Sequence, residues 1–103
     1  MTFDEIIKSF DDHLSKSLKQ YYKDFYVGIT ENVDQRLFGY HRVNQNTDWW
    51  IYCIADTEEI ARAVEAYFLE KGMDGDRGGG KGKGKTKIVY CYEITDNTKE
   101  HDD

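Results

Sequence analysis

The sequence predicts an α+β fold in which a small, three-stranded and largely antiparallel sheet is flanked by helices, in the order α-β-α-β-α-β. Three segments repeat apolar residues at helical spacing, and three short runs are rich in aromatic and β-branched residues. A ferredoxin-like fold is less favoured, because it needs a fourth strand. The 103 residues suit a single domain, which we place at residues 1–95, followed by an acidic tail at 96–103 that we expect to fray.

The first helix is expected over residues 2–19. Thr2 and Glu5 have the spacing of a capping box, in which each side chain satisfies a backbone N–H at the start of the helix. One face carries a stripe of large apolar side chains, namely Phe3, Ile6, Ile7, Phe10, Leu14 and Leu18. This helix should therefore pack against another element.

The first strand is expected around residues 25–29, whose aromatic and β-branched side chains suit a half-buried sheet. Gly28 interrupts this run, and a glycine inside a strand is typical of a place where another group approaches the backbone closely. Thr30 or Asn32 can cap the helix that follows. The buried stripe of that helix consists of Val33, Leu37 and Tyr40. Arg36 lies at the edge of this stripe.

The second strand, residues 49–55, is apolar throughout, which favours a central position in the sheet with both faces covered. A third helix begins after Asp56 or Thr57. Its buried stripe consists of Ile60, Ala63, Val64 and Tyr67, joined by Ala61 and Phe68. One step of about 100° from Val64 places Glu65 at the border between this stripe and solvent.

Composition indicates a soluble, acidic protein with a net charge of −6 at pH 7. The chain contains no apolar run long enough to span a membrane, and its N-terminus lacks the pattern of a signal peptide. We therefore expect a cytoplasmic location and no membrane partner. Cys53 and Cys91 fall in expected strands without metal-ligand spacing, which indicates buried thiols. The histidines (His13, His41 and His101) are too scattered to predict a zinc site.

Residues 72–87 contain seven of the nine glycines and are expected to form a flexible loop before a last strand at residues 88–95. From Lys71 to Lys87, six positive residues oppose two aspartates, which gives a local charge of +4. The candidate nucleic-acid-binding residues of this loop are Arg77, Lys81, Lys83 and Lys85. The loop can equally be a soluble connector.

Residues 79–86 also match a phosphate-loop pattern, which ends here in Lys85 and Thr86. In nucleotide-binding proteins this pattern follows a strand and opens a helix, whose N-terminus directs backbone N–H groups at a phosphate. Here a helix precedes the pattern and a strand follows it. We therefore expect no nucleotide cofactor.

The stretch at residues 26–41 resembles the second half of the GIY-YIG nuclease signature. Tyr-Val-Gly at residues 26–28 is followed by Arg36, eight residues beyond Gly28, and by His41, thirteen residues beyond it. The family cleaves phosphodiesters, so the resemblance implies an endonuclease that acts on DNA or RNA with Mg²⁺ or Mn²⁺.

The resemblance also implies roles for individual residues. Glu65, on a helix similar to the one that carries the family's metal-binding glutamate, would hold the cation through a carboxylate oxygen. Arg36 would stabilise the phosphate, and Tyr26, alone or with His41, would orient or deprotonate water. The ordinary alternative for Glu65 is a solvated side chain.

The family's first strand, with Gly-Ile-Tyr, has no counterpart ahead of residue 26. The strand at 88–95 could occupy its place from the other end of the chain, as in a circular permutation, and bring Tyr90 or Tyr92 to the vacant position. Tyr22 is a competing substitute. The family's late asparagine, which follows a proline, is also missing, since the chain has no proline.

Two functions from different classes therefore remain open. One is a small metal-dependent endonuclease aided by the basic loop. The other is a catalytically inactive interaction module of the same fold that binds a protein or a nucleic acid, which the net charge of −6 and the missing first strand favour.

Overall fold

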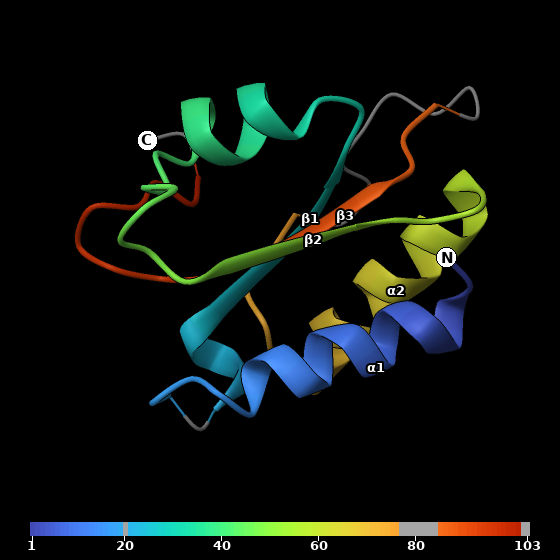
Figure 1. Cartoon of the computed structure of the whole chain (residues 1–103), viewed down its shortest axis with the longest axis horizontal. Coiled ribbons are helices and arrows are strands. Elements are labelled where there is room, and N and C mark those ends of the chain that lie inside the picture. Colours follow the sequence, from blue (N-terminus) through green and yellow to red (C-terminus); the bar gives the residue numbers. More distant parts are fainter. Residues whose placement is uncertain (20, 77–84, 102–103) are drawn as a thin grey trace.

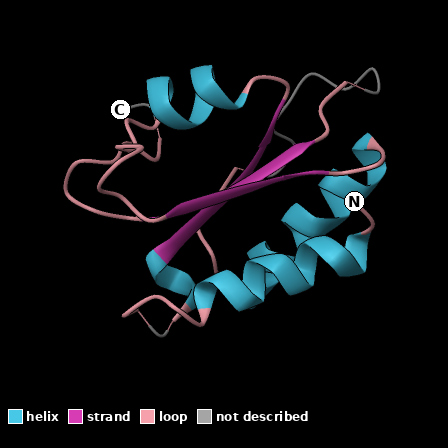
Figure 2. Cartoon of the chain, viewed as in Figure 1, coloured by secondary structure: helices cyan, strands magenta, loops and turns pink. Residues whose placement is uncertain are grey.

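The computed structural model describes residues 1–19, 21–76 and 85–101 and shows an α+β fold built on a three-stranded sheet. Its regular elements are α1 (Phe3–Leu14), β1 (Phe25–Thr30), β2 (Trp50–Ile54), α2 (Glu58–Lys71) and β3 (Ile88–Glu93), with a 3-10 turn η1 (Tyr22–Asp24) and a π-helix η2 (Asp34–Tyr40). Helices α1 and α2 lie on one side of the sheet and η2 lies on the other (Figures 1 and 2). Among the described residues, no helix has both the length and the apolar character needed to cross a membrane.

The strand order is β1-β3-β2, and β3 pairs antiparallel with both neighbours. The predicted antiparallel sheet is therefore confirmed, but the expectation that the second strand is central is wrong. β2 is an edge strand, in which Cys53 is buried while Tyr52 and Ile54 are 40% and 56% exposed. Only Cys53 of β2 is buried, and the central strand is β3, which is buried from Val89 to Tyr92.

The predicted order of elements is only partly matched, because the segment between β1 and β2 is a π-helix rather than an α-helix. The His41 N–H donates to the Arg36 carbonyl oxygen at 3.0 Å, a bond that spans five residues instead of four. Asn32 Oδ1 accepts from the Gln35 N–H at 3.1 Å ahead of η2. Apolar residues spaced three and four positions apart predict a helix, but this spacing does not distinguish an α-helix from a π-helix.

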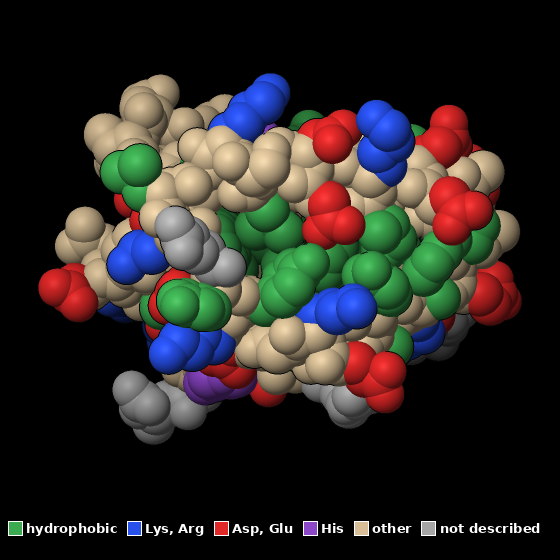
Figure 3. Space-filling view, turned by 90° about the horizontal axis from the view of Figure 1, so that it is seen from below, with side chains coloured by type: hydrophobic (Ala, Val, Ile, Leu, Met, Phe, Trp, Pro, Cys, Tyr) green, Lys and Arg blue, Asp and Glu red, His purple; other side chains and the backbone are tan. Residues whose placement is uncertain are grey.

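The main core lies between the sheet and the two α-helices. Its fully buried members include Ile6, Phe10, Val27, Val64, Phe68, Val89 and Cys91. The capping box predicted for α1 is present, and Thr57 caps α2 by accepting from the Ile60 N–H. Helix α1 ends at Leu14, well before the expected residue 19. Figure 3 views the molecule from the side of these helices and shows apolar side chains gathered along the middle of that face.

A second, smaller cluster lies under η2. It consists of Tyr26, Leu37, Val43, Tyr90 and Tyr92. The described part of the acidic tail, residues 96–101, packs beside this cluster instead of fraying, and the Lys99 N–H donates to the His41 carbonyl oxygen at 2.8 Å. Both cysteines are free and buried, as predicted.

Replacing Gly28 with alanine should lower the free energy of unfolding by about 1–3 kcal/mol, as overpacking of a close contact does. Gly28 lies directly opposite Tyr90, and an added Cβ would collide with the hydroxyl and ring of that tyrosine. Urea unfolding followed by circular dichroism measures the loss. Gly39→Ala is the matched control, since a Cβ there meets only the Asp34 carbonyl oxygen at 3.7 Å. Equal stability of Gly28→Ala and the wild type would contradict this close approach.

Candidate active site

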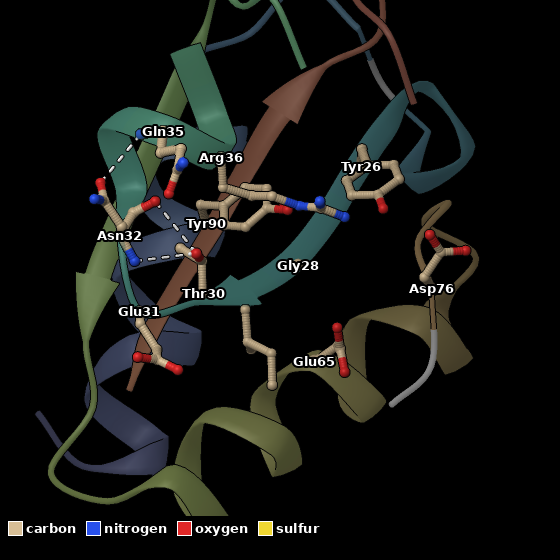
Figure 4. Close-up of a pocket in the computed structure, with 11 residues that line it drawn as sticks. Tyr26, Gly28, Thr30, Glu31, Asn32, Gln35, Arg36, Glu65, Asp76 and Tyr90 are labelled. Carbon is tan, nitrogen blue, oxygen red and sulfur yellow. Dashed lines mark hydrogen bonds between the residues drawn. The ribbon is translucent and has the colours of Figure 1, made fainter. Parts of the chain in front are cut away.

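An open pocket of about 710 Å³ lies where β1, β3, the start of η2 and α2 meet (Figure 4). Four residues predicted from the sequence line it: Tyr26, Arg36, Glu65 and Tyr90. They come from four different elements, so only the folded sheet brings them together. His41 does not line the pocket; it lies buried behind Tyr90.

The position of Tyr90 depends on the register of β1 and β3. Tyr90 pairs with Gly28, and the missing side chain of Gly28 leaves room for the tyrosine ring to lie across β1. Tyr26, two residues earlier on the same face of β1, stacks with Tyr90 at a centroid distance of 6.4 Å. The two phenols therefore form one wall of the pocket.

His41 is completely buried and has polar partners at both ring nitrogens. Nδ1 lies 2.6 Å from the Lys99 carbonyl oxygen, and Nε2 lies 2.8 Å from the Tyr90 hydroxyl. A carbonyl oxygen only accepts, so Nδ1 carries the proton and donates it. In the neutral ring Nε2 is then an acceptor, and the Tyr90 hydroxyl donates to it. Tyr90 thus points its proton at His41 and its oxygen lone pairs at the pocket.

Burial decides the charge states of these groups. It lowers the pKa of His41 to about 4, against the smaller raising effect of the hydrogen bond to Lys99, so the ring is neutral at pH 7. Burial also raises the pKa of Tyr90 to about 12, although Arg36 lowers it. The pKa of Tyr26 is raised well above its usual value by burial and by the nearby Tyr90. Both phenols therefore keep their protons near neutral pH.

Arg36 projects from η2 into the pocket, and its side chain extends past Tyr90 toward Tyr26 (Figure 4). The guanidinium carbon lies 4.1 Å from the centre of the Tyr40 ring, a cation–π contact. Burial lowers the pKa of Arg36, but the hydrogen bond with Tyr90 and the neighbouring phenols raise it by more. Arg36 is therefore a fixed positive charge in front of the Tyr90 oxygen.

The π-helix explains how Arg36 and His41 both reach Tyr90. In an α-helix, residues five apart point about 140° apart around the axis. In η2 the His41 N–H bonds to the Arg36 carbonyl oxygen, so these residues lie one wide turn apart. Tyr90 is consequently held between a cation on its pocket side and a neutral imidazole on its buried side.

Glu65 lies on α2 and is only 4% exposed, which differs from the position at the edge of the stripe expected from the sequence. Its carboxylate points toward the pocket (Figure 4). Within the described residues, no group of three His, Cys, Asp or Glu side chains is arranged to hold a metal ion. Mg²⁺ often keeps several waters and binds through one carboxylate together with substrate oxygens. A single glutamate that faces an open pocket fits that mode of binding.

The pocket also contains polar residues that sequence reasoning missed. They are Glu31 and Asn32 just before η2, Gln35 in its first turn, and Asp76 after α2. Asn32 was expected only as a helix cap, and nothing in the local pattern around Asp76 distinguishes it from an ordinary loop aspartate. Their placement depends on contacts between segments far apart in the chain.

The remaining candidates lie elsewhere. The Tyr92 hydroxyl contacts Glu100 Oε2 at 3.1 Å behind the pocket, and the Tyr22 hydroxyl contacts Asp11 on the side of α1. Lys85 is exposed and does not line the pocket. Arg77, Lys81 and Lys83, with most of the phosphate-loop pattern, lie outside the described residues.

Comparison of this chain with protein-family models, with curated proteins and with solved structures finds no match. The function is therefore inferred from the chemistry of the pocket and from the resemblance in the sequence.

The buried neutral imidazole of His41 predicts that stability falls in acid. Its pKa of about 4 in the folded protein lies below the ordinary 6.5, so between these values the unfolded chain binds the proton more readily. The contribution is present in full above pH 6.5 and is lost as the pH falls through 4, by up to about 3 kcal/mol. Urea unfolding between pH 7 and 4 measures this slope. His41→Gln, which cannot titrate, should lack it; equal slopes in the two proteins would contradict the buried neutral state.

Proposed function

We propose that this chain is a metal-dependent endonuclease of the GIY-YIG type, in which the strand that carries the first tyrosine comes from the C-terminal end of the domain. The observation that carries the proposal is the Tyr90 hydroxyl, which donates to neutral His41 and faces Arg36 in a pocket that also contains Glu65. These are the residue types that the resemblance predicts for hydrolysis of a phosphodiester.

The topology supports the circular permutation. β3 pairs antiparallel with β1, the strand that carries Tyr-Val-Gly, and Tyr90 lies opposite Gly28. A strand from the end of the chain therefore supplies a tyrosine beside the Tyr26 strand, where the sequence lacks one ahead of β1. Of the three candidates, Tyr90 is the tyrosine that lines the pocket, while Tyr92 and Tyr22 do not.

Arg36 would bind the scissile phosphate. Its guanidinium is already ordered by the Tyr40 ring and by Tyr90, so little conformational freedom is lost when a phosphate binds. A planar fork of N–H donors matches two phosphate oxygens and stabilises the negative charge that develops during attack. The protonated Tyr26 hydroxyl on the same wall would orient the attacking water by hydrogen bonding.

Tyr90 and His41 would carry the proton. A water molecule attacks phosphorus, and the phosphorus–oxygen bond to the leaving group breaks. The proton of the water moves to the Tyr90 oxygen as the Tyr90 proton moves to Nε2 of His41, so Tyr90 never has to exist as a free phenolate. The imidazolium that results is stabilised by its Nδ1–H bond to the Lys99 carbonyl oxygen. The leaving oxygen takes its proton from solvent in the open pocket.

Glu65 is the residue that would hold Mg²⁺ or Mn²⁺, through a carboxylate oxygen at the pocket wall. When bound, such an ion supplies positive charge next to the phosphate. The pocket needs this charge, because Glu31, Glu65 and Asp76 contribute three carboxylates against the single guanidinium of Arg36.

The alternative function is a catalytically inactive module of this fold that binds a protein or a nucleic acid, and the same charge balance favours a protein as its partner. A pocket with three carboxylates on a chain of net charge −6 attracts a polyanion poorly. The two functions differ in whether the arrangement around Tyr90 is used for chemistry.

Arg36→Ala, Glu65→Gln and Tyr90→Phe should each lower the rate of nucleic-acid cleavage by at least about 100-fold, since each removes charge stabilisation or proton transfer. The assay uses labelled single- and double-stranded DNA and RNA with Mg²⁺ or Mn²⁺, and circular dichroism confirms that each variant is folded. Matched controls outside the pocket are Arg62→Ala, Glu59→Gln and Tyr52→Phe.

Cleavage that needs the metal, is lost in the three variants and persists in the controls would support the nuclease. Cleavage that the three variants retain would come from another site or a contaminant. A folded protein that cleaves none of the substrates would favour the interaction module.

A further inference from the structure

The C-terminal end of the described chain returns to the candidate site. We name residues 99–101 the C-terminal strap. Its backbone makes two bonds with His41: the Lys99 N–H donates to the His41 carbonyl oxygen, and the Lys99 carbonyl oxygen accepts from Nδ1 of the ring. Glu100 Oε2 accepts from the Tyr92 hydroxyl. The strap therefore supplies the acceptor that fixes the tautomer of His41.

His101, the last residue of the strap, contacts two carboxylates with its two ring nitrogens. Nε2 lies 3.1 Å from both oxygens of Asp74, and Nδ1 lies 3.2 Å from an oxygen of Asp76. Ionised carboxylates only accept, so both nitrogens need a proton to make these contacts. Only the imidazolium carries both protons, which means that the geometry describes the charged form of His101.

These contacts connect the strap to the pocket. Asp76 lines the pocket, and Tyr26, also on its wall, packs against the His101 ring at a centroid distance of 5.8 Å. Asp74 is bonded to β1 through its backbone: its N–H donates to the Phe25 carbonyl oxygen, and its carbonyl oxygen accepts from the Val27 N–H. His101 thus ties the strap to a segment fixed against the first strand.

We propose that the C-terminal strap positions the His41–Tyr90 pair, and that protonated His101 locks the strap by bridging Asp74 and Asp76. Lys99 holds Nδ1 of His41, so that Nε2 remains the acceptor for Tyr90. Loss of the His101 bridge frees the strap and removes the Lys99 carbonyl oxygen from Nδ1. Nδ1 is then left with the Tyr92 hydroxyl, 3.0 Å away, which can donate as well as accept and so does not fix the tautomer. His101 is a positioning residue in this scheme, and only its effect on cleavage rests on the proposed nuclease function.

The lock depends on pH in a defined direction. The bond to Asp74 is the largest effect that raises the pKa of His101, and Asp76 adds to it. Below pH 6.5, the ordinary pKa of histidine, His101 is therefore charged and holds the strap against His41, which we call the closed strap. The strap opens as the pH rises through the raised pKa of His101. The other groups that face His101 are neutral His41 and the phenol of Tyr26, with Arg42, Lys99 and Glu100 lining the same side of the molecule.

Amide hydrogen exchange of the full chain, followed by NMR, tests the lock without any substrate. The reporter is the Lys99 N–H, whose bond to His41 exists only when the strap is closed. Its protection, corrected for the intrinsic effect of pH, should fall about tenfold as His101 loses its proton, as expected when a hydrogen bond to a charged group is lost. His101→Gln should show the low protection at every pH, while Asn97→Ala, in the same tail, should behave like the wild type.

Full protection of Lys99 in His101→Gln, or protection that does not change with pH in the wild type, would overturn the proposal. Cleavage assays form a separate arm: if the wild type cleaves nucleic acid, His101→Gln should lower kcat with little change in KM and flatten the pH profile of kcat. A wild type that does not cleave at all would refute the nuclease, and the exchange result would still decide whether the strap is locked by His101.

Discussion

The hydrogen bonds of the buried His41 ring are the interaction on which the candidate site depends. A polar ring without solvent must find partners for both nitrogens, and here they come from β3 and from the C-terminal strap. Because the Lys99 carbonyl oxygen fixes the proton on Nδ1, the Tyr90 hydroxyl can only donate to Nε2. One buried imidazole therefore links the end of η2, the central strand and the tail, and determines the orientation of the tyrosine in the pocket.

The sheet makes this arrangement possible. The central strand β3 is the last strand of the chain, so the site is completed only when residues far apart in sequence have paired. Gly28 leaves the space for the Tyr90 ring, and the wide winding of η2 lets Arg36 and His41 approach the same tyrosine from opposite sides. Arg36, which would bind the phosphate, and His41, which would accept the proton, therefore both contact Tyr90.

Local sequence patterns predicted the three strands and the two α-helices, and the resemblance pointed to four residues that line the pocket, namely Tyr26, Arg36, Glu65 and Tyr90. Such patterns depend on neighbours in sequence, so they did not give the order of the strands in the sheet. The apolar run of β2 predicted a central strand, but the central strand is β3. Such patterns also could not distinguish π from α winding in η2, or show that Glu65 is a buried residue that lines the pocket. The contacts of Asp76 and His101 are long-range ion pairs, for which spacing in the sequence carries no signal.

The protonation of the His41 ring is the most direct test of this account, and NMR of the two ring nitrogens in the ¹⁵N-labelled wild type measures it. Near pH 7 we expect Nδ1 to carry the proton and Nε2 to be an unprotonated acceptor, and this state should persist until the pH approaches about 4. A ring protonated on Nε2, or one that titrates near its ordinary 6.5, would contradict the account, because Tyr90 would then have no acceptor for its proton.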